Sequence, residues 1–221
     1  GGARQGHAIH TNKGSGTGTM EGTISGNTIG IAGVAESGAS ESSGITVASR
    51  GTGGVHTAVV SNNTIRQFDE FGINLEVGED GGAIPSSSAT LNVTVTGNNI
   101  SEPGPNALHG IHLNSGILVT DDNTSCVDIG GAGGLSNNVP NAANEGNGGS
   151  DIRPRQRQGT RVNMPGYGGT AFDNAAVNTY ITGRNSLTTV AASSNNNGLT
   201  ANDGFFKNDK ILGETAVQIR E

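Results

Sequence analysis

The sequence lacks the residues from which a compact globular core is usually built. It contains no tryptophan, and aromatic residues make up only 3% of its 221 positions. Because aromatic side chains supply much of the buried area in most cores, a two-layer domain would be short of material. There are instead 38 glycines, against about 15 at an average usage of roughly 7%. Glycine together with Asn, Ser and Thr, interspersed with Val and Ile, is typical of many short strands joined by tight turns.

Other shortages exclude whole classes of protein. Charged residues are only 14% of the chain, too few for a disordered polyelectrolyte. The net charge of −7 disfavours long-range attraction to nucleic acid or to an anionic membrane, so neither is expected as a partner. No apolar run approaches the roughly 18 residues of a membrane span. The single cysteine, Cys126, has no partner for an internal disulfide, and the opening GGARQGHAIH has neither the basic nor the apolar region of a signal peptide.

What the chain does have is a repeat. The motif SGNTIG at 25–30 returns as SNNTIR at 61–66, TGNNIS at 96–101 and SNNVPN at 136–141. Its asparagines are 36, 35 and 40 residues apart, namely Asn27, Asn63, Asn98 and Asn138. A second element travels with the motif as HAIHT, SGITV, FGINL and HGIHL, marked by Ile9, Ile45, Ile73 and Ile111. A fixed unit with loops of variable length is typical of a solenoid.

Within each unit the apolar residues alternate with the period of a strand. Ile45 and Val47 flank Thr46, and the later units repeat this pattern. Three short strands per unit predict a right-handed parallel β-helix of four to five coils, stacked about 4.8 Å apart. Ile45, Ile73 and Ile111 are then expected to form an inward ladder. An outward row is expected to contain Thr46, Asn74, His112 and Arg153.

The repeated asparagines fit the corners between strands. Asparagine tolerates the left-handed conformation of a tight corner and bonds to nearby backbone groups. Stacked on its equivalents in neighbouring coils, it also extends an amide ladder along the axis. We therefore interpret Asn27, Asn63, Asn98 and Asn138 as a structural ladder; a row of sugar-binding amides is the alternative.

The repeat resembles that of bacterial right-handed parallel β-helix proteins of the pectin-lyase-like superfamily, whose coils follow a pattern close to GIxL…VxxNxI. The resemblance covers about residues 5–160. The segments CVDIGGAGGLSNNV and DIRPRQRQGTRVNMPGY also resemble the terminal coils of large secreted or surface-attached members. It implies an extracellular or cell-surface location on a bacterium. Lyases of the superfamily combine acidic Ca²⁺ ligands with a catalytic Arg or Lys, and neither that set nor the paired Asp residues of its hydrolases can be matched here.

After the fourth asparagine the repeat breaks down. We divide the chain into coils at 1–160 and a C-terminal cap at 161–221 of the same domain. TAFDNAAVNTYITGRN predicts an amphipathic helix near 171–183, with Thr170 as its N-cap, Asp173 three residues on and Gly183 as its C-cap. This helix is interpreted as a lid over the core, or as a docking helix for another chain. Two further strands are expected at 187–192 and 215–220, and the second pairs either within the chain or with a neighbour.

One group of acidic residues stands without an obvious base. It comprises Asp69, Glu70, Glu76, Glu79 and Asp80. Such carboxylates suit Ca²⁺, which takes six to eight oxygen ligands, or the acid and base of a glycoside hydrolase. A solvated acidic face is the plainer interpretation, because no DxDxDG spacing or nonapeptide Ca²⁺ repeat is present.

Four of the twelve basic residues lie within nine positions: Arg153, Arg155, Arg157 and Arg161. The first three alternate, so they are expected to share one strand face. One interpretation is a site for an anion or an acidic polysaccharide, since guanidinium groups pair carboxylates bidentately. The other is a charged terminal coil that resists edge-to-edge association.

Two HxxH pairs, His7 with His10 and His109 with His112, do not predict a metal site. In a regular strand, residues i and i+3 point to opposite faces. His10 and His112 share the outward row, but they are three coils or roughly 14 Å apart.

Together these observations predict a non-enzymatic, extracellular structural or adhesive module, with self-association into an assembly as an open alternative. Its first coil has no visible cap, so we expect a homo-oligomeric contact or an upstream domain there. A polysaccharide-binding or polysaccharide-degrading β-helix is the alternative, and enzymatic activity stays open. No cofactor other than Ca²⁺ is suggested.

Overall fold

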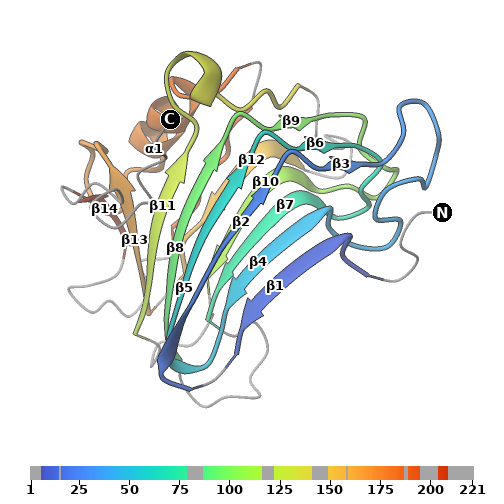
Figure 1. Cartoon of the computed structure of the whole chain (residues 1–221). Coiled ribbons are helices and arrows are strands. Elements are labelled where there is room, and N and C mark those ends of the chain that lie inside the picture. Colours follow the sequence, from blue (N-terminus) through green and yellow to red (C-terminus); the bar gives the residue numbers. More distant parts are fainter. Residues whose placement is uncertain are drawn as a thin grey trace, which may run out of the picture.

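The chain forms a parallel β-solenoid in a computed structural model (Figure 1). The structure describes residues 6–14, 16–78, 87–115, 122–140, 149–157, 159–186, 189–194 and 204–208. All pairings between strands in this part are parallel. The predicted fold class, a β-helix with one short helix near its C-terminal end, is confirmed.

Three sheets run along the solenoid, and each of the first three coils contributes one strand to each sheet. Sheet 1 contains β1 (Ile9–Lys13), β4 (Ile45–Ser49), β7 (Phe71–Val77), β10 (His109–Ser115) and β12 (Ser150–Arg155). Sheet 2 contains β2 (Gly18–Ser25), β5 (Thr52–Ser61), β8 (Ser88–Thr96), β11 (Asn123–Ile129), β13 (Thr160–Pro165) and β14 (Gly204–Asn208). Sheet 3 is narrow, with β3 (Thr28–Ile29), β6 (Thr64–Ile65) and β9 (Asn99–Ile100), and single bridges extend it to Asn138 and Ser186.

The core is a set of apolar ladders inside these sheets. In sheet 1, Ile45, Ile73, Ile111 and Ile152 stand in register and are fully buried. Isoleucines of sheet 3 face them across the coil, and valines of sheet 2 close the third side. Since each coil contributes few large side chains, the ladder replaces the aromatic core that the composition excludes.

A glycine before the inward isoleucine turns the corner between sheets 3 and 1. A Cβ added at Gly72 would lie 2.5 Å from Cγ2 of Ile100 and 2.6 Å from the carbonyl oxygen of Gly110. Gly44 is equally confined, because its Cβ would lie 2.6 Å from Cγ2 of Ile65. Close approach of the backbone to the isoleucine of sheet 3 therefore explains the recurring Gly-Ile pair.

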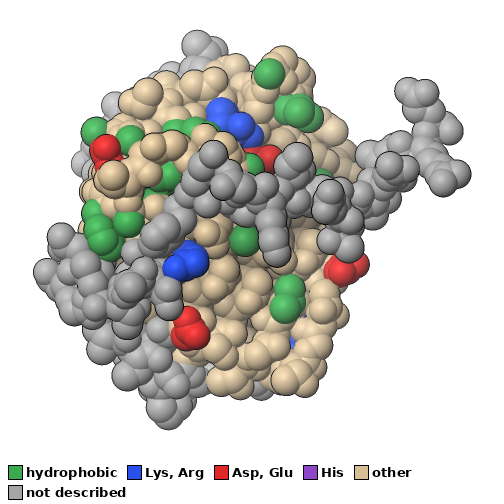
Figure 2. Space-filling model, turned by 90° about the vertical axis from the view of Figure 1, so that its left-hand side faces the viewer, with side chains coloured by type: hydrophobic (Ala, Val, Ile, Leu, Met, Phe, Trp, Pro, Cys, Tyr) green, Lys and Arg blue, Asp and Glu red, His purple; other side chains and the backbone are tan. Residues whose placement is uncertain are grey.

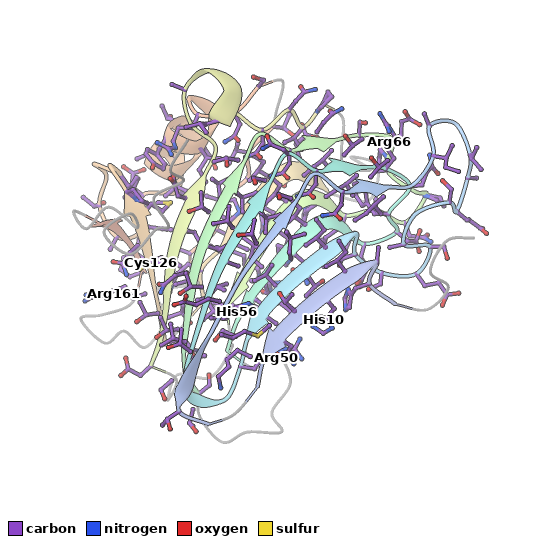
Figure 3. The ribbon with its side chains drawn as sticks, in the orientation of Figure 1. His10, Arg50, His56, Arg66, Cys126 and Arg161 are labelled. Carbon is purple, nitrogen blue, oxygen red and sulfur yellow. The ribbon has the colours of Figure 1, made fainter. Side chains whose placement is uncertain are left out.

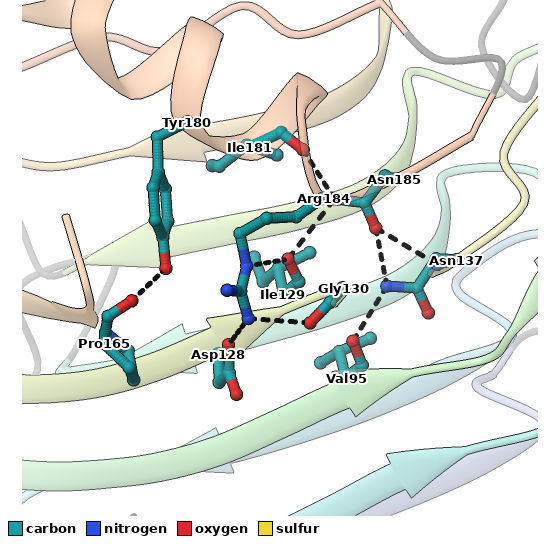
Figure 4. Close-up of polar contacts among 10 residues, drawn as sticks. All are labelled: Val95, Asp128, Ile129, Gly130, Asn137, Pro165, Tyr180, Ile181, Arg184 and Asn185. Atoms are coloured by element: carbon teal, nitrogen blue, oxygen red, sulfur yellow. Dashed lines mark hydrogen bonds and ion pairs between the residues drawn. The ribbon is translucent and has the colours of Figure 1, made fainter. Parts of the chain in front are cut away.

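The asparagine ladder runs the length of the solenoid. Asn63 Oδ1 accepts hydrogen bonds from the backbone N–H and from Nδ2 of Asn27, at 3.0 and 2.9 Å. The same pair of bonds joins Asn63 to Asn98 and Asn98 to Asn137. Asn137 bonds in turn to Asn185 (Figure 4).

The fourth rung was therefore predicted one residue too late. Asn138 instead donates to Oδ1 of Asn99, at 3.0 Å, and bridges sheet 3. Consecutive asparagines occupy both sites here, and the spacing of the repeat alone does not tell which of the two turns the corner. The fifth rung, Asn185, follows the helix and was not predicted.

Helix α1 (Asn174–Thr182) packs at the C-terminal end of the solenoid (Figure 1). Val177 and Ile181 are buried in the core, and Gly183 is the C-cap. The N-cap is Asp173, whose side chain accepts from the N–H of Ala176 at 2.9 Å. The prediction of Thr170 as N-cap is wrong, because the chain makes another turn before the helix begins.

The segment after the helix returns to the solenoid. Arg184 pairs with Asp128, donates to the carbonyl oxygen of Gly130 at 2.8 Å and lies over the ring of Tyr180 (Figure 4). Within 187–192, where a strand was expected, Val190 makes a single bridge to Ile152. The strand β14 was not predicted, and the expected strand at 215–220 lies outside the described residues.

Candidate functional site

The outward face of sheet 1 collects histidine, amide and charged side chains from five consecutive coils. Its central row is His10, Thr46, Asn74, His112 and Arg153, each paired in register with the next. This is the outward row that the repeat predicted. Thr46, Asn74 and His112 are nevertheless almost completely buried, so the row is a packed polar layer.

A chain of polar contacts crosses this layer. His112 Nδ1 lies 3.2 Å from Oδ1 of Asn74, and Nδ2 of Asn74 donates to Oε1 of Glu76 at 2.7 Å. The other carboxylate oxygen of Glu76 is paired with Arg50. Because an amide oxygen only accepts, the bond assigns the proton of a neutral His112 to Nδ1 and leaves Nε2 as the unprotonated nitrogen. Asn74 thus orients both the imidazole and the carboxylate.

Three rings pack together at the start of the layer. The ring of Phe71 lies 4.4 Å from that of His112 and 5.7 Å from that of His109, between centroids. His109 and His112 are themselves 5.1 Å apart. Burial lowers the pKa of His109 to about 4 and holds the pKa of His112 well below its usual value, so both rings are neutral near pH 7.

The expectation that HxxH residues point to opposite faces is wrong. His7 and His10 also pack ring against ring, with centroids 4.7 Å apart. At the corner, two successive residues face the core: Ile73, and Gly72, whose Cβ would meet Ile100. Two inward residues in a row therefore separate the two histidines of each HxxH pair, so both histidines lie on the outward side of the sheet.

His7 binds the layer from its N-terminal end. Its Nδ1 lies 2.9 Å from both Oγ of Ser42 and Oγ1 of Thr46. Burial lowers the pKa values of His7 and His10, against the opposing effect of the Glu76 carboxylate. Neither His7 nor Ser42 was singled out by the sequence analysis as part of this network.

The described acidic residues of this group have partners other than a metal ligand set. Asp69 accepts two hydrogen bonds from Nδ2 of Asn106, at 3.1 and 3.0 Å. Glu76 forms an ion pair with Arg50, a base that the sequence did not indicate because it lies 26 residues earlier in the chain. Burial, with the charges of Glu76 and Asp69, raises the pKa of Glu70. Glu79 and Asp80 lie outside the described residues, and among the described ones no three His, Cys, Asp or Glu side chains are grouped to hold a metal.

The four arginines divide between two sheets. Arg153 and Arg155 stand beside His112 and Asn114 on sheet 1, and Arg153 donates to the carbonyl oxygen of Ala191 at 2.9 Å. Arg157 follows the end of β12, where its N–H donates to Ser115. Arg161 pairs with Thr124 in sheet 2, on the opposite side of the molecule from His10 and Arg50 (Figure 3). The expected cluster is thus reduced to two residues on one face.

The outward face of sheet 2 is chemically plainer. One row comprises Thr19, Val55, Thr90 and Thr124, and another comprises Thr23, Val59, Thr94 and Asp128. On the side where β13 and β14 lie, the described charged side chains are scattered among polar and backbone atoms (Figure 2). The chemistry of the molecule is therefore concentrated on sheet 1.

Comparison with family models, curated proteins and solved structures returned no match for this chain. The described residues also contain no helix with the length and apolar character needed to cross a membrane.

Proposed function

We propose that this chain is a non-enzymatic structural or adhesive module of an extracellular bacterial assembly, and that it meets a neighbour through its first coil. The observation that carries the proposal is the state of that coil. β1, β2 and β3 each pair on one side only among the described strands. A solenoid end of this kind needs a cap or a partner.

The side chains of the first coil support this. Ile9 is only partly buried, whereas its equivalents in the next coils are completely buried. Beyond β3, Ile31 and Val34 are 62% and 48% exposed, on a loop that bonds Glu102 through the N–H of Gly33 at 2.8 Å. Apolar side chains held out next to unpaired strand edges favour a protein contact.

Sedimentation velocity over a wide concentration range, combined with hydrogen exchange, tests this proposal. We expect either self-association or, in a monomer, fast exchange of the amides in β1–β3 relative to those of β5 and β8. A chain that stays monomeric at high concentration, with β1–β3 as well protected as β5, contradicts it.

The polar layer of sheet 1 favours a second candidate, a β-helix that binds or degrades acidic polysaccharide. Arg153 suits the carboxylate of a uronic acid, and the ring of Phe71 packs against His112, the neighbour of Arg153 in the sheet. The neutral His112, oriented by Asn74, has the arrangement of a general base. A kinship with the pectin-lyase-like superfamily would accord with this candidate.

Incubation with acidic polysaccharides, with and without Ca²⁺, tests the second candidate. The second candidate is favoured over the structural module if unsaturated products or reducing ends are released. This release should be lost in Arg153→Ala but kept in the sheet 2 variant Asn92→Ala. Binding without product release would assign the face to recognition. The absence of both leaves the structural module as the function.

A further inference from the structure

The asparagine ladder shows what kind of partner fits the open end. At each interface between coils, Oδ1 of the later asparagine accepts from the N–H and Nδ2 of the earlier one. In return, Nδ2 of the later asparagine donates to a carbonyl of the earlier coil. These acceptors are the carbonyl oxygens of Ile24, Val60, Val95 and Ile129, at 2.8 to 3.3 Å. Three directional bonds therefore repeat at four successive interfaces.

The first rung has only half of this set. Asn27 donates to Asn63 as the other rungs do, but Oδ1 of Asn27 accepts from no described residue. Its Nδ2 donates to the carbonyl oxygen of Ser25 in its own coil at 3.2 Å, as Nδ2 of Asn98 does to Thr96, but it bonds to no described carbonyl of an earlier coil. The missing bonds are those that a preceding coil supplies at every other interface.

We propose that the N-terminal end of the solenoid is a docking surface for one further parallel coil that carries an asparagine at the ladder position. This inference rests on the proposed function and specifies its partner. The backbone N–H and Nδ2 of the incoming asparagine donate to Oδ1 of Asn27. A carbonyl at the end of the incoming coil's second strand accepts from Asn27 Nδ2, while β1, β2 and β3 gain neighbours.

The C-terminal end of a second copy does not meet this requirement. Its last rung, Asn185, has its Nδ2 bonded to the carbonyl oxygens of Ile129 and Ile181 (Figure 4). The N–H of Asn185 donates to the carbonyl oxygen of Thr182. Those donors are already used, so head-to-tail stacking of identical chains leaves Asn27 incomplete. The partner is therefore a coil with a free asparagine, and not this chain's own last coil.

The test adds such a coil. A copy of residues 30–65 is placed ahead of residue 1. This keeps the spacing at the corner to within one residue, because eight residues precede Ile9 and the seven residues 66–72 separate Ile65 from Ile73. We expect the amides of Asn27 and of β1–β3 to exchange more slowly by over about tenfold than in the unfused chain. The added segment should itself become protected.

Two matched variants isolate the ladder. Alanine at the copied Asn63 should remove most of the gained protection at Asn27, and Asn27→Ala should destabilise the fused chain more than the unfused one. Unchanged exchange in β1–β3, or an added segment that stays unprotected on a native solenoid, overturns the inference. Fast exchange of the first coil in the unfused chain would still leave the proposed function standing.

Discussion

At the scale of single residues, the asparagines of the ladder fix the register between coils through their hydrogen bonds. Each internal rung satisfies two donors of the coil before it and one carbonyl, and for Asn98 these groups belong to the buried residues Asn63 and Val60. A buried polar group without a partner costs about 1–3 kcal/mol, so the ladder penalises any slip in register between coils.

We therefore expect Asn98→Ala to lower the free energy of unfolding by more than about 2 kcal/mol. The substitution leaves the N–H and Nδ2 of Asn63 and the carbonyl oxygen of Val60 without these hydrogen-bond partners. Asn27→Ala is the matched control at the open end, where Oδ1 accepts from no described residue, and should cost less than about 1 kcal/mol. Urea denaturation measures both; equal losses would contradict a role for the ladder in register.

The corner glycines allow a second prediction. Gly72→Ala should destabilise the protein by about 1–3 kcal/mol, because its Cβ would overlap Ile100 and a backbone oxygen of the next coil. Gly22→Ala is the control, since nothing lies within 4 Å of a Cβ there. Thermal unfolding of the two variants compares them, and a Gly72→Ala protein as stable as Gly22→Ala would refute the packing argument.

At the scale of elements, the helix depends on its N-cap, which is Asp173 and not the predicted Thr170. Asp173→Ala should cost about 0.5–2 kcal/mol through loss of the bond to the N–H of Ala176. Thr170→Ala should be close to neutral, because its contact with Tyr167 uses the backbone carbonyl. Chemical denaturation of both variants makes the measurement, and the reverse order would restore Thr170 as the cap.

The contact between β10 and β12 predicts sensitivity to acid. Nδ1 of His109 lies 3.1 Å from the N–H of Ser150 and 3.3 Å from its carbonyl oxygen, and in the neutral ring that burial favours it accepts from the N–H. Its pKa is lowered to about 4, mainly by burial, and in the unfolded chain it rises to about 6.5. Between these values the unfolded state binds more protons, so this contribution is complete above pH 6.5 and is lost as the pH falls toward 4.

The variant His109→Asn separates this effect from the loss of ion pairs in acid, since an amide oxygen accepts the same bond without titrating. We expect its melting temperature to fall less than that of the wild type between pH 6.5 and 4. The difference between the two melting curves is the measurement. An equal fall in melting temperature between pH 6.5 and 4 for the variant and the wild type would show that His109 does not cause the acid sensitivity.

At the scale of the whole molecule, every interface joins residues far apart in sequence. Successive rungs of the ladder are separated by 36, 35, 39 and 48 residues. Loop closure must precede each pairing, so the fold has a high contact order.

Refolding after dilution from denaturant should accordingly take milliseconds to seconds, as in other proteins dominated by non-local strand pairing. Stopped-flow circular dichroism measures the rate. A chain that refolds within microseconds would contradict the predicted cost of loop closure.

Much of the fold was predictable because short repeating patterns in the sequence specify each coil of the solenoid. The Gly-Ile pair, the alternation of the strands and the asparagine motif each repeat with the coil, and so place Ile45, Ile73 and Ile111 in register. The errors fall where the repeat is ambiguous or interrupted. Two adjacent asparagines made Asn138 stand for Asn137, and the helix inserted in the fifth coil concealed Asn185 and β14.

The candidate site was predictable only as a row. The outward order from Thr46 to Arg153 follows from strand alternation alone. The contacts that give the row its chemistry do not, because Arg50 reaches Glu76 across a coil and two inward residues at the corner bring His109 and His112 together.

The sequence by itself determined the coil, since the inward and outward alternation and the corner residues act within a few positions. Only the tertiary structure decided which side chains meet and which end stays open. Stacking brings together positions 28 to 48 residues apart. It also buries His112, which is 5% exposed, and this burial keeps the His112 ring neutral. It also leaves Asn27, alone among the described rungs, without the coil that would complete it.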